Sequence, residues 1–207
     1  MNGAAKKSRA AWGSNARYLR TIAFTVAGML ALILTVNFLV DPLWYFDGNR
    51  ITGKNARYNE RYSKINLFLK NPGKYDCIIL GSSTTTLLNP DLINGYTCFN
   101  LSFSRGHIEE YIDFLRYTDR YTRDLKLVVV GFDTYNFLVN PLDAKDDLAP
   151  QFVRDHSARP RPFRSYLALE TFAASVKTLL NVVDNGGYYD RDFKAVMVGS
   201  HDPYDPN

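Results

Sequence analysis

A serine turn directly after an apolar segment is the first place in this sequence where chemistry is expected. Residues 77–80 read Cys-Ile-Ile-Leu, and Gly81-Ser82-Ser83 follow them. A short apolar run that ends at a glycine is typical of a strand covered on both faces, as in parallel sheets. Reacting groups in such folds gather beyond the carboxyl ends of the strands, so a hydroxyl here can serve as a nucleophile. The same serines could instead cap a following helix, and the local sequence leaves both interpretations open.

Two further apolar segments are expected to end beside this turn. Residues 97–101 and 125–131 predict a second and a third strand. Between the strands, residues 83–94 predict a turn with a short helix, and residues 107–121 predict a longer amphipathic helix. Strands that alternate with helices in this way predict a parallel α/β sheet, in which all three strand ends lie on one edge.

The three strand ends resemble the motif blocks of the SGNH (GDSL-like) hydrolase superfamily, especially its membrane-anchored branch in envelope polysaccharide acylation. That family carries its nucleophile in a Gly-Asp-Ser turn, which Gly81-Ser82-Ser83 matches with Ser83 at the nucleophile position. Its second block supplies an oxyanion-binding glycine, which Gly106, six residues after Asn100, matches. The resemblance implies a three-layer, flavodoxin-like α/β domain behind one transmembrane helix, and a serine esterase or O-acyltransferase that needs no cofactor.

The third block departs from the family pattern. The family has Gly-x-Asn-Asp, and Gly131-Phe132-Asp133-Thr134 matches only its glycine. An ionised Asp133 cannot donate a hydrogen bond to an oxyanion and would repel its charge. Asn136 could supply the missing amide if the loop turns back, and Asp133 could instead cap backbone groups at the end of its strand.

A serine nucleophile also needs a base, which the family places in a C-terminal Asp-x-x-His. The sequence has three histidines, His107, His156 and His201, and none has an aspartate three residues before it. His107 follows Gly106 but is expected to cap its helix rather than to serve the site. Either the catalytic domain continues beyond residue 207, which we expect, or the chain is a non-catalytic relative that binds a polysaccharide or a secretion partner.

The N-terminal part of the chain predicts a membrane anchor. A basic arm over residues 1–20 precedes residues 21–40, which carry no charge. Twenty helical residues span about 30 Å, the thickness of a hydrocarbon core. A cleavable signal peptide and a buried core helix are the alternatives to this signal-anchor helix. Because the basic residues all precede the span, the positive-inside rule leaves the N-terminus in the cytoplasm and the domain in the periplasm or outside the cell.

The remainder of the chain is almost neutral, which limits its partners. Residues 41–207 hold 20 of the 25 basic residues and all 21 acidic ones. This balance offers no electrostatic footprint for nucleic acid. We expect the bilayer, an envelope glycan and polysaccharide-assembly proteins as partners. Two cysteines and three scattered histidines predict no metal site.

Residues 41–74 are expected to form a juxtamembrane segment with a helix over residues 55–70. Apolar residues recur there at spacings of three and four. Arg57, Arg61 and Lys64 form a basic stripe on the same helix. Such a stripe is more often a solvated face than a binding site, so we expect it to be exposed.

The α/β domain is expected to occupy residues 75–207. Cys77 and Cys98 lie in its apolar segments, and we expect two buried free thiols rather than a disulfide. Residues 141–164, with four prolines, predict an exposed excursion or lid, and one helix is expected over residues 163–183. The arginines of this excursion could dock an anionic polymer or a lipid headgroup; they are Arg154, Arg159, Arg161 and Arg164.

Overall fold

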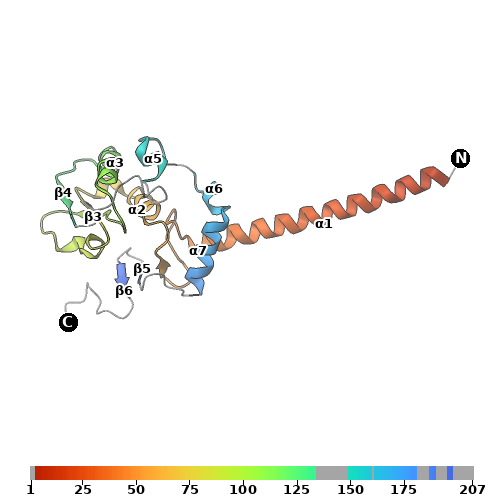
Figure 1. The fold of residues 1–207 in the computed structure, drawn as a ribbon, viewed down its shortest axis with the longest axis horizontal. Helices are drawn as coiled ribbons and strands as arrows, with labels where there is room; N and C mark the ends of the chain where they lie inside the picture. Colours follow the sequence, from red (N-terminus) through yellow and green to blue (C-terminus); the bar gives the residue numbers. More distant parts are fainter. Residues whose placement is uncertain (1–2, 134–148, 160, 181–186, 190–194, 198–207) are drawn as a thin grey trace.

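The structure is a computed structural model, and its described helices and strands form a mixed α/β protein with one long N-terminal helix (Figure 1). The residues that it describes are 3–133, 149–159, 161–180, 187–189 and 195–197.

Helix α1 runs from Gly3 to Val40 and projects away from the rest of the described chain (Figure 1). Its segment Asn15–Val40 is long and apolar enough to cross a membrane, and the most apolar 18 residues of that segment have a mean hydropathy of 2.2. Only 6% of those 18 residues are buried, so the alternative of a buried core helix is wrong. A signal sequence is also an apolar helix near the N-terminus, and that alternative stays open.

Three short parallel strands form the sheet at the centre of the α/β part. They are β2 (Cys77–Leu80), β3 (Cys98–Asn100) and β4 (Leu127–Val130), in the order β3-β2-β4. All the β2 residues are buried, because β2 is central and covered on both faces. The parallel sheet predicted from the alternation of apolar and helical segments is therefore confirmed.

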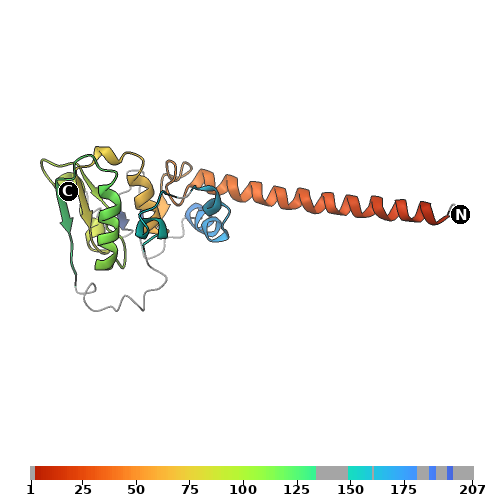
Figure 2. The same ribbon diagram turned by 90° about the horizontal axis from the view of Figure 1, so that it is seen from above.

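The two faces of this sheet are covered differently. Ile78 and Leu80 pack into a core with α2 (Glu60–Phe68), α3 (Ile108–Asp119) and α5 (Gln151–Arg154). Figure 2 shows α3 lying alongside the strands. On the other face, Ile79 packs with the two cysteines, with β4 residues and with Ile93, which follows the 3₁₀ turn η3 (Pro90–Leu92), and this cluster contains no residue of an α-helix among the described residues. Another 3₁₀ turn, η2 (Thr85–Leu87), follows β2. Among the described residues, then, the helical layer lies on one face only. The finer flavodoxin-like arrangement is not confirmed.

The helix predicted over residues 55–70 is shorter than expected. Asn55–Ala56 form strand β1, which pairs antiparallel with β5 (Gly187–Tyr189), and β5 pairs in turn with β6 (Ala195–Met197). Helix α2 begins only at Glu60, because Asn59 has a left-handed φ of 43° and accepts a hydrogen bond from the Tyr62 amide. A further short turn, η1 (Pro72–Lys74), follows α2.

The helix predicted over residues 163–183 is divided in two. Helix α6 spans Phe163–Tyr166 and α7 spans Leu169–Leu179, with extended backbone at Ala168 between them. Residues 181–183 lie outside the described residues. Helix α7 lies against the C-terminal end of α1 (Figure 1), where the Ser175 hydroxyl donates to Asn37 Oδ1 at 2.7 Å.

The excursion predicted over residues 141–164 is only partly exposed where the structure describes it, since Arg154, Arg161 and Arg164 are exposed but an apolar group is not. Ala149, Phe152 and Val153 are buried in the core beside α2 and α3. The prediction is therefore wrong for this apolar group, which packs into the core despite the prolines and charges around it. Residues 141–148 lie outside the described residues.

The two cysteines form a disulfide, so the prediction of free thiols is wrong. Cys77 and Cys98 are direct neighbours in the parallel register of β2 and β3, and their Cα atoms are 4.2 Å apart. Sequence alone could not supply this register, which decides the pairing. A disulfide is typical of a domain exposed to an oxidising compartment.

The chain leaves α1 through a turn built around Asp41. Its carboxylate accepts hydrogen bonds from the backbone amides of Tyr45 at 2.9 Å, Phe46 at 2.7 Å and Gly48 at 2.9 Å, and from the Tyr166 hydroxyl. Burial raises the pKa of the Asp41 carboxyl, and these donors oppose that rise only in part. The turn thereby connects α1 directly to α6.

Candidate functional site

The carboxyl ends of the three parallel strands place the predicted site residues together. We call this region the sheet edge and define it by Ser82, Ser83, Gly106 and Asp133. The two serines differ in their surroundings: Ser82 is 2% exposed and its hydroxyl donates to Asp133 Oδ2, whereas Ser83 is exposed. Among the described residues, the Ser83 hydroxyl has no hydrogen-bond partner. Ser83 is therefore the serine that an incoming ligand can reach.

The serines do not cap a helix. The element that follows them, η2, begins at Thr85, and its N-cap residue is Thr84, whose side chain makes no capping hydrogen bond. The backbone makes the turn instead, because the Ser82 carbonyl accepts from the amides of Thr85 at 3.1 Å and Thr86 at 3.3 Å. The capping interpretation of Ser82 and Ser83 is therefore wrong.

Glycines are needed at the strand ends because the turns pack closely. A Cβ atom on Gly81 would clash with Thr85 Oγ1, and one on Gly131 would clash with the same oxygen. A Cβ atom on Gly106 would lie 3.0 Å from the Gly81 carbonyl and 2.7 Å from the Tyr111 hydroxyl oxygen. The backbones of Gly81, Gly106 and Gly131 thus converge around one turn, as the parallel topology predicted.

Asp133 contacts the serine turn through Ser82. The hydrogen bond from the Ser82 hydroxyl holds the turn after β2 against the end of β4. Asp133 accepts this hydrogen bond and so fixes the turn that carries Ser82 and Ser83. Asn136, predicted as an alternative oxyanion donor, lies outside the described residues.

Asn100, at the end of β3, also fixes the neighbouring turns. Its side-chain amide donates to the carbonyls of Thr85 at 2.9 Å and Leu88 at 2.8 Å. Its Oδ1 accepts from the Ser102 amide at 3.1 Å. Asn100 therefore joins the turn after β2 to the loop that leads to Gly106.

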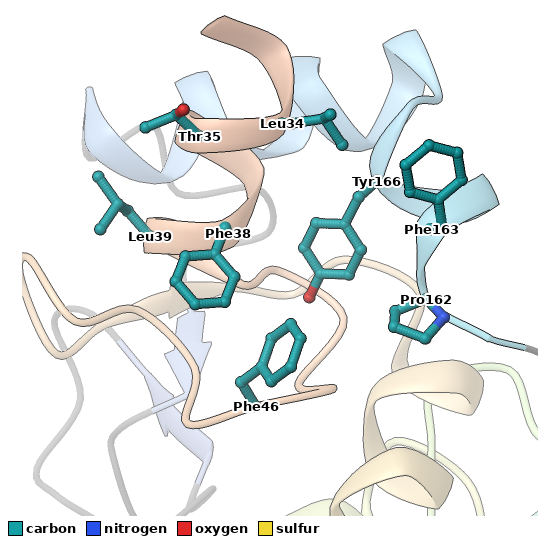
Figure 3. Close-up of a pocket in the computed structure, with 8 residues that line it drawn as sticks. All are labelled: Leu34, Thr35, Phe38, Leu39, Phe46, Pro162, Phe163 and Tyr166. Carbon is teal, nitrogen blue, oxygen red and sulfur yellow. The ribbon is translucent and has the colours of Figure 1, made fainter. Parts of the chain in front are cut away.

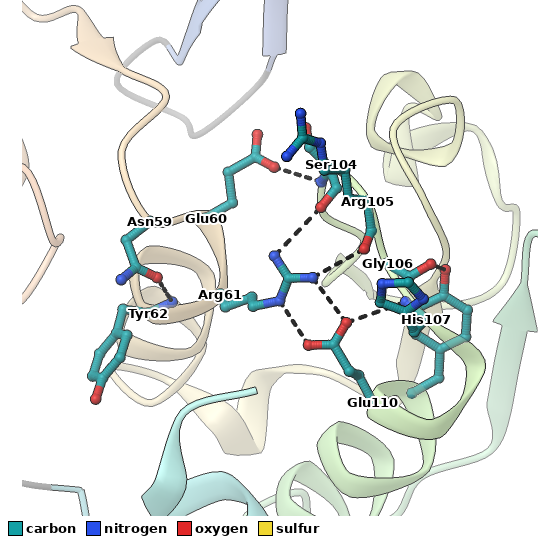
Figure 4. Close-up of polar contacts among 10 residues, drawn as sticks. Asn59, Glu60, Arg61, Tyr62, Ser104, Arg105, Gly106, His107 and Glu110 are labelled. Atoms are coloured by element: carbon teal, nitrogen blue, oxygen red, sulfur yellow. Dashed lines mark hydrogen bonds and ion pairs between the residues drawn. The ribbon is translucent and has the colours of Figure 1, made fainter. Parts of the chain in front are cut away.

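Charged residues of α2 hold this loop from the other side. We call them, with their partner on α3, the α2 cluster: Glu60, Arg61, Lys64 and Glu110. Arg61 pairs with Glu110 at 2.7 and 2.8 Å (Figure 4). The same guanidinium donates to the Arg105 carbonyl at 3.0 Å. The pair therefore fastens the loop directly before Gly106.

Two more members of the α2 cluster bind the same loop. The Glu60 carboxylate accepts from the Ser104 amide at 2.5 Å (Figure 4), and Lys64 Nζ donates to the Ser102 carbonyl. Glu60 also accepts from the Tyr189 hydroxyl at 2.5 Å. These contacts fix the backbone that presents Gly106 at the sheet edge.

The prediction that the basic stripe on this helix is solvated is wrong. Arg61 is 8% exposed and Lys64 is 1% exposed, and the Arg57 guanidinium lies 3.8 Å from Glu60. The sequence did carry a signal: Arg61 and Lys64 share a helical face with Ile65 and Phe68, which are buried. A cationic residue on an apolar face predicts a buried partner, and here the partner comes from distant segments.

Burial shifts the titration of this cluster. Burial lowers the pKa of Lys64 to about 8, although the nearby Glu60 charge opposes that change. For Glu60, burial alone would raise the pKa, but the Lys64 charge and the hydrogen bonds from Tyr189 and Ser104 outweigh it and leave the pKa lowered. Lys64 is thus less basic than an exposed lysine, and Glu60 is held as a carboxylate.

The two described histidines, His107 and His156, have structural roles at the ends of helices. His107 is buried at the N-cap of α3, as predicted, and its backbone amide donates to Glu110 at 3.1 Å (Figure 4). His156 follows α5, and its carbonyl accepts from Arg120. His201 lies outside the described residues. The described part of the chain contains no group of three metal-ligating side chains that could hold a metal ion.

No family model, curated protein or solved structure matches this chain. The geometry of the sheet edge and the sequence motifs therefore provide the basis for the proposed function.

Proposed function

We propose that this protein is a membrane-anchored serine esterase or O-acyltransferase of the SGNH type. Its substrates are O-acyl groups, with O-acetyl as the leading candidate, on a glycan of the cell envelope. Ser83 is the nucleophile, and the backbone amides of Ser83 and Gly106 bind the oxyanion.

The observation that carries this proposal is the arrangement at the carboxyl edge of the parallel sheet. The exposed Ser83 hydroxyl, the Gly106 backbone and the Ser82–Asp133 hydrogen bond all lie at adjacent strand ends. Reacting groups in open parallel sheets gather at this edge. The α2 cluster supports the arrangement because it binds the loop that carries Gly106.

The proposed reaction has two steps. The Ser83 oxygen bonds to the acyl carbon, the ester bond to the glycan oxygen breaks, and the serine proton passes through a base to that oxygen. Water or an acceptor hydroxyl then attacks the acyl-serine, takes the acyl group and returns a proton to Ser83. Neither described histidine is assigned as the base, since His107 lies at the N-cap of α3 and His156 follows α5.

Two features support a location outside the cytoplasm. Helix α1 is apolar enough to anchor the chain, and the basic residues precede its apolar part. The Cys77–Cys98 disulfide suits an oxidising compartment such as the periplasm. A reporter enzyme that is active only outside the cytoplasm, fused after residue 60, should be active. Activity of a cytoplasm-dependent reporter at the same position would contradict this topology.

An ester hydrolysis assay with p-nitrophenyl acetate tests the nucleophile. In the full-length chain in micelles, Ser83→Ala should reduce turnover on the order of 1,000-fold or more, to the uncatalysed background. Thr84→Ala alters the adjacent exposed side chain and should keep the parent rate. Equal turnover by Ser83→Ala and the parent protein would remove Ser83 as the nucleophile.

A non-catalytic glycan-binding protein is the second candidate. It is favoured by one observation: among the described residues, Asp133 contacts Ser82, and His107 and His156 take other places. In that case glycan affinity, measured by calorimetry with the full-length chain, would survive Ser83→Ala. Esterase activity in the parent would exclude this candidate.

A further inference from the structure

An apolar groove lies where the end of α1 meets α6. Its volume is about 430 Å³. The groove is lined by Leu34, Thr35, Phe38, Leu39, Phe46, Pro162, Phe163 and Tyr166 (Figure 3). Thr35 is the only hydroxyl among the lining residues from α1, and its oxygen donates to the Ala31 carbonyl within the helix. The groove therefore offers a surface for hydrocarbon rather than for a sugar.

The position of the groove along α1 places it at the boundary of a bilayer. Residues 15–32 are exposed all round, whereas the domain begins to cover the helix at Ile33. The uncharged residues 21–40 span about 30 Å at helical rise, the thickness of a hydrocarbon core, whereas residues 15–20 include Arg17 and Arg20. The groove residues 34–39 lie in the last two turns of the uncharged stretch, at its outer end. The groove thus lies where lipid acyl chains end and headgroups begin.

Helices α6 and α7 show large apolar side chains beside the same end of α1. Phe163 is 65% exposed, Leu169 is 68% exposed and Leu180 is 70% exposed. Figure 1 shows both helices next to the end of α1, at the side of the domain from which α1 projects. Apolar side chains in that position can enter the boundary region of a membrane.

Two arginines are sequence neighbours of groove residues from the domain. Arg161 and Arg164 are exposed and lie on either side of Pro162 and Phe163 in the sequence. Both also line a second, polar cavity of about 590 Å³ beside α5. Guanidinium groups bind phosphate well, and their attraction to anionic lipid surfaces is substantial.

We propose that the groove binds one acyl chain of a membrane phospholipid, whose phosphate is bound by Arg161 and Arg164. Phe163 inserts beside that chain, so α6 lies at the bilayer surface. The sheet edge would then be held at a defined height above the membrane. This proposal does not depend on the esterase chemistry, and the loss of either proposal leaves the other intact.

Quenching by brominated phospholipids tests the insertion of α6. The full-length chain carrying Phe163→Trp is reconstituted in phosphatidylcholine nanodiscs with or without bromine on the acyl chains. Phe132→Trp is the matched control, because Phe132 is also exposed but follows β4. After subtraction of the signal from Trp12 and Trp44, quenching should be at least twice as strong at position 163 as at position 132. Equal quenching at both positions would overturn the proposal.

Native mass spectrometry tests the occupancy of the groove. The full-length chain released from mild detergent should retain one phospholipid. Thr35→Phe fills the groove and should lose it, whereas Thr25→Phe, on the same helix outside the groove, should keep it. Retention of lipid by Thr35→Phe, or its absence from the parent protein, would overturn the groove assignment even if position 163 is quenched.

Removal of the arginines tests the headgroup contact. In mixed phosphatidylglycerol and phosphatidylcholine, the parent protein should retain mainly the anionic lipid. Arg161→Gln and Arg164→Gln should each reduce that preference about fivefold. An unchanged preference in the double variant would show that the arginines do not bind the phosphate.

Discussion

The two ends of the described domain use polar groups in opposite ways. At the junction with α1, which we define by Asn37, Asp41, Tyr166 and Ser175, all four residues are buried and hydrogen-bonded to one another or to nearby backbone. At the sheet edge, Ser82 is buried and bonded to Asp133. Its neighbour Ser83 is exposed.

The junction with α1 therefore has a structural role, whereas the sheet edge exposes a side chain to solvent. Polar groups at the junction are satisfied internally, so they fix the position of α1 relative to α6 and α7. The sheet edge has a fixed frame, formed by Ser82, Asp133 and the α2 cluster, which carries one exposed hydroxyl. A polar residue that faces solvent on a rigid frame is the arrangement that a catalytic or binding group requires.

The largest expected effect is at the junction. Asp41→Ala leaves the amides of Tyr45, Phe46 and Gly48 without their acceptor, and should lower the free energy of unfolding by about 5 kcal/mol. Chemical unfolding of the full-length chain in micelles measures this. Asp47→Ala is the control, since the Asp47 side chain is 78% exposed, and it should cost less than about 0.5 kcal/mol. Similar losses in both variants would contradict the role of the Asp41 turn.

The support beneath the sheet edge should be almost as sensitive. Arg61→Met leaves Glu110 buried and unpaired, and should lower the free energy of unfolding by about 4 kcal/mol. The double variant Arg61→Met, Glu110→Met removes both charges and should recover much of that loss. If the double variant is as unstable as the single one, the contacts of Arg61 with the Ser104 and Arg105 carbonyls carry the effect, and the ion pair does not.

Lys64 should make the stability of this support depend on pH. Its pKa is about 8 in the folded chain and 10.5 in the unfolded chain, so between these values the unfolded state binds more protons. The free energy of unfolding contributed by Lys64 therefore rises with pH across that window, by about 3 kcal/mol at most. Unfolding of the parent and of Lys64→Met from pH 7.5 to 10.5 measures the difference. Parallel pH profiles would contradict the burial of a charged Lys64.

The smallest effect distinguishes the two adjacent serines. Ser82→Ala removes the hydrogen bond to Asp133 and should lower the free energy of unfolding by about 1 kcal/mol. Ser83→Ala removes an exposed hydroxyl and should change it by less than about 0.5 kcal/mol. A larger loss of unfolding free energy for Ser83→Ala than for Ser82→Ala would contradict the structural role of Ser82 and the exposure of Ser83.

Local patterns predicted much of this fold. The apolar runs gave the three strands, the helical spacing gave the helix that begins after His107, and the strand ends brought Gly81, Gly106 and Gly131 together. The long uncharged stretch predicted the N-terminal helix, although α1 begins before residue 21. These predictions are correct because the period of the apolar residues and the order of the segments can be read from neighbouring residues.

Predictions that needed contacts between distant segments failed. The prediction that the basic stripe on α2 is solvated failed because Glu110 and the Ser102–Arg105 backbone bury Arg61 and Lys64. The prediction of free thiols failed because the register of β2 and β3 places Cys77 opposite Cys98. The prediction of one helix after residue 163 failed because the segment forms two helices with different contacts. Helix α6 contacts the Asp41 turn and α7 contacts α1.

Sequence by itself determined which residues reach the carboxyl edge of the sheet, because the positions of the strands along the chain and of the glycines at their ends can be read from local composition. Only the tertiary structure decided that Ser82 is buried on Asp133 while Ser83 is exposed, and that the charges of α2 lie under the loop before Gly106. The reason is that burial of a hydroxyl or a charge depends on whether a partner from elsewhere in the chain satisfies it, and such partners are a property of the folded chain.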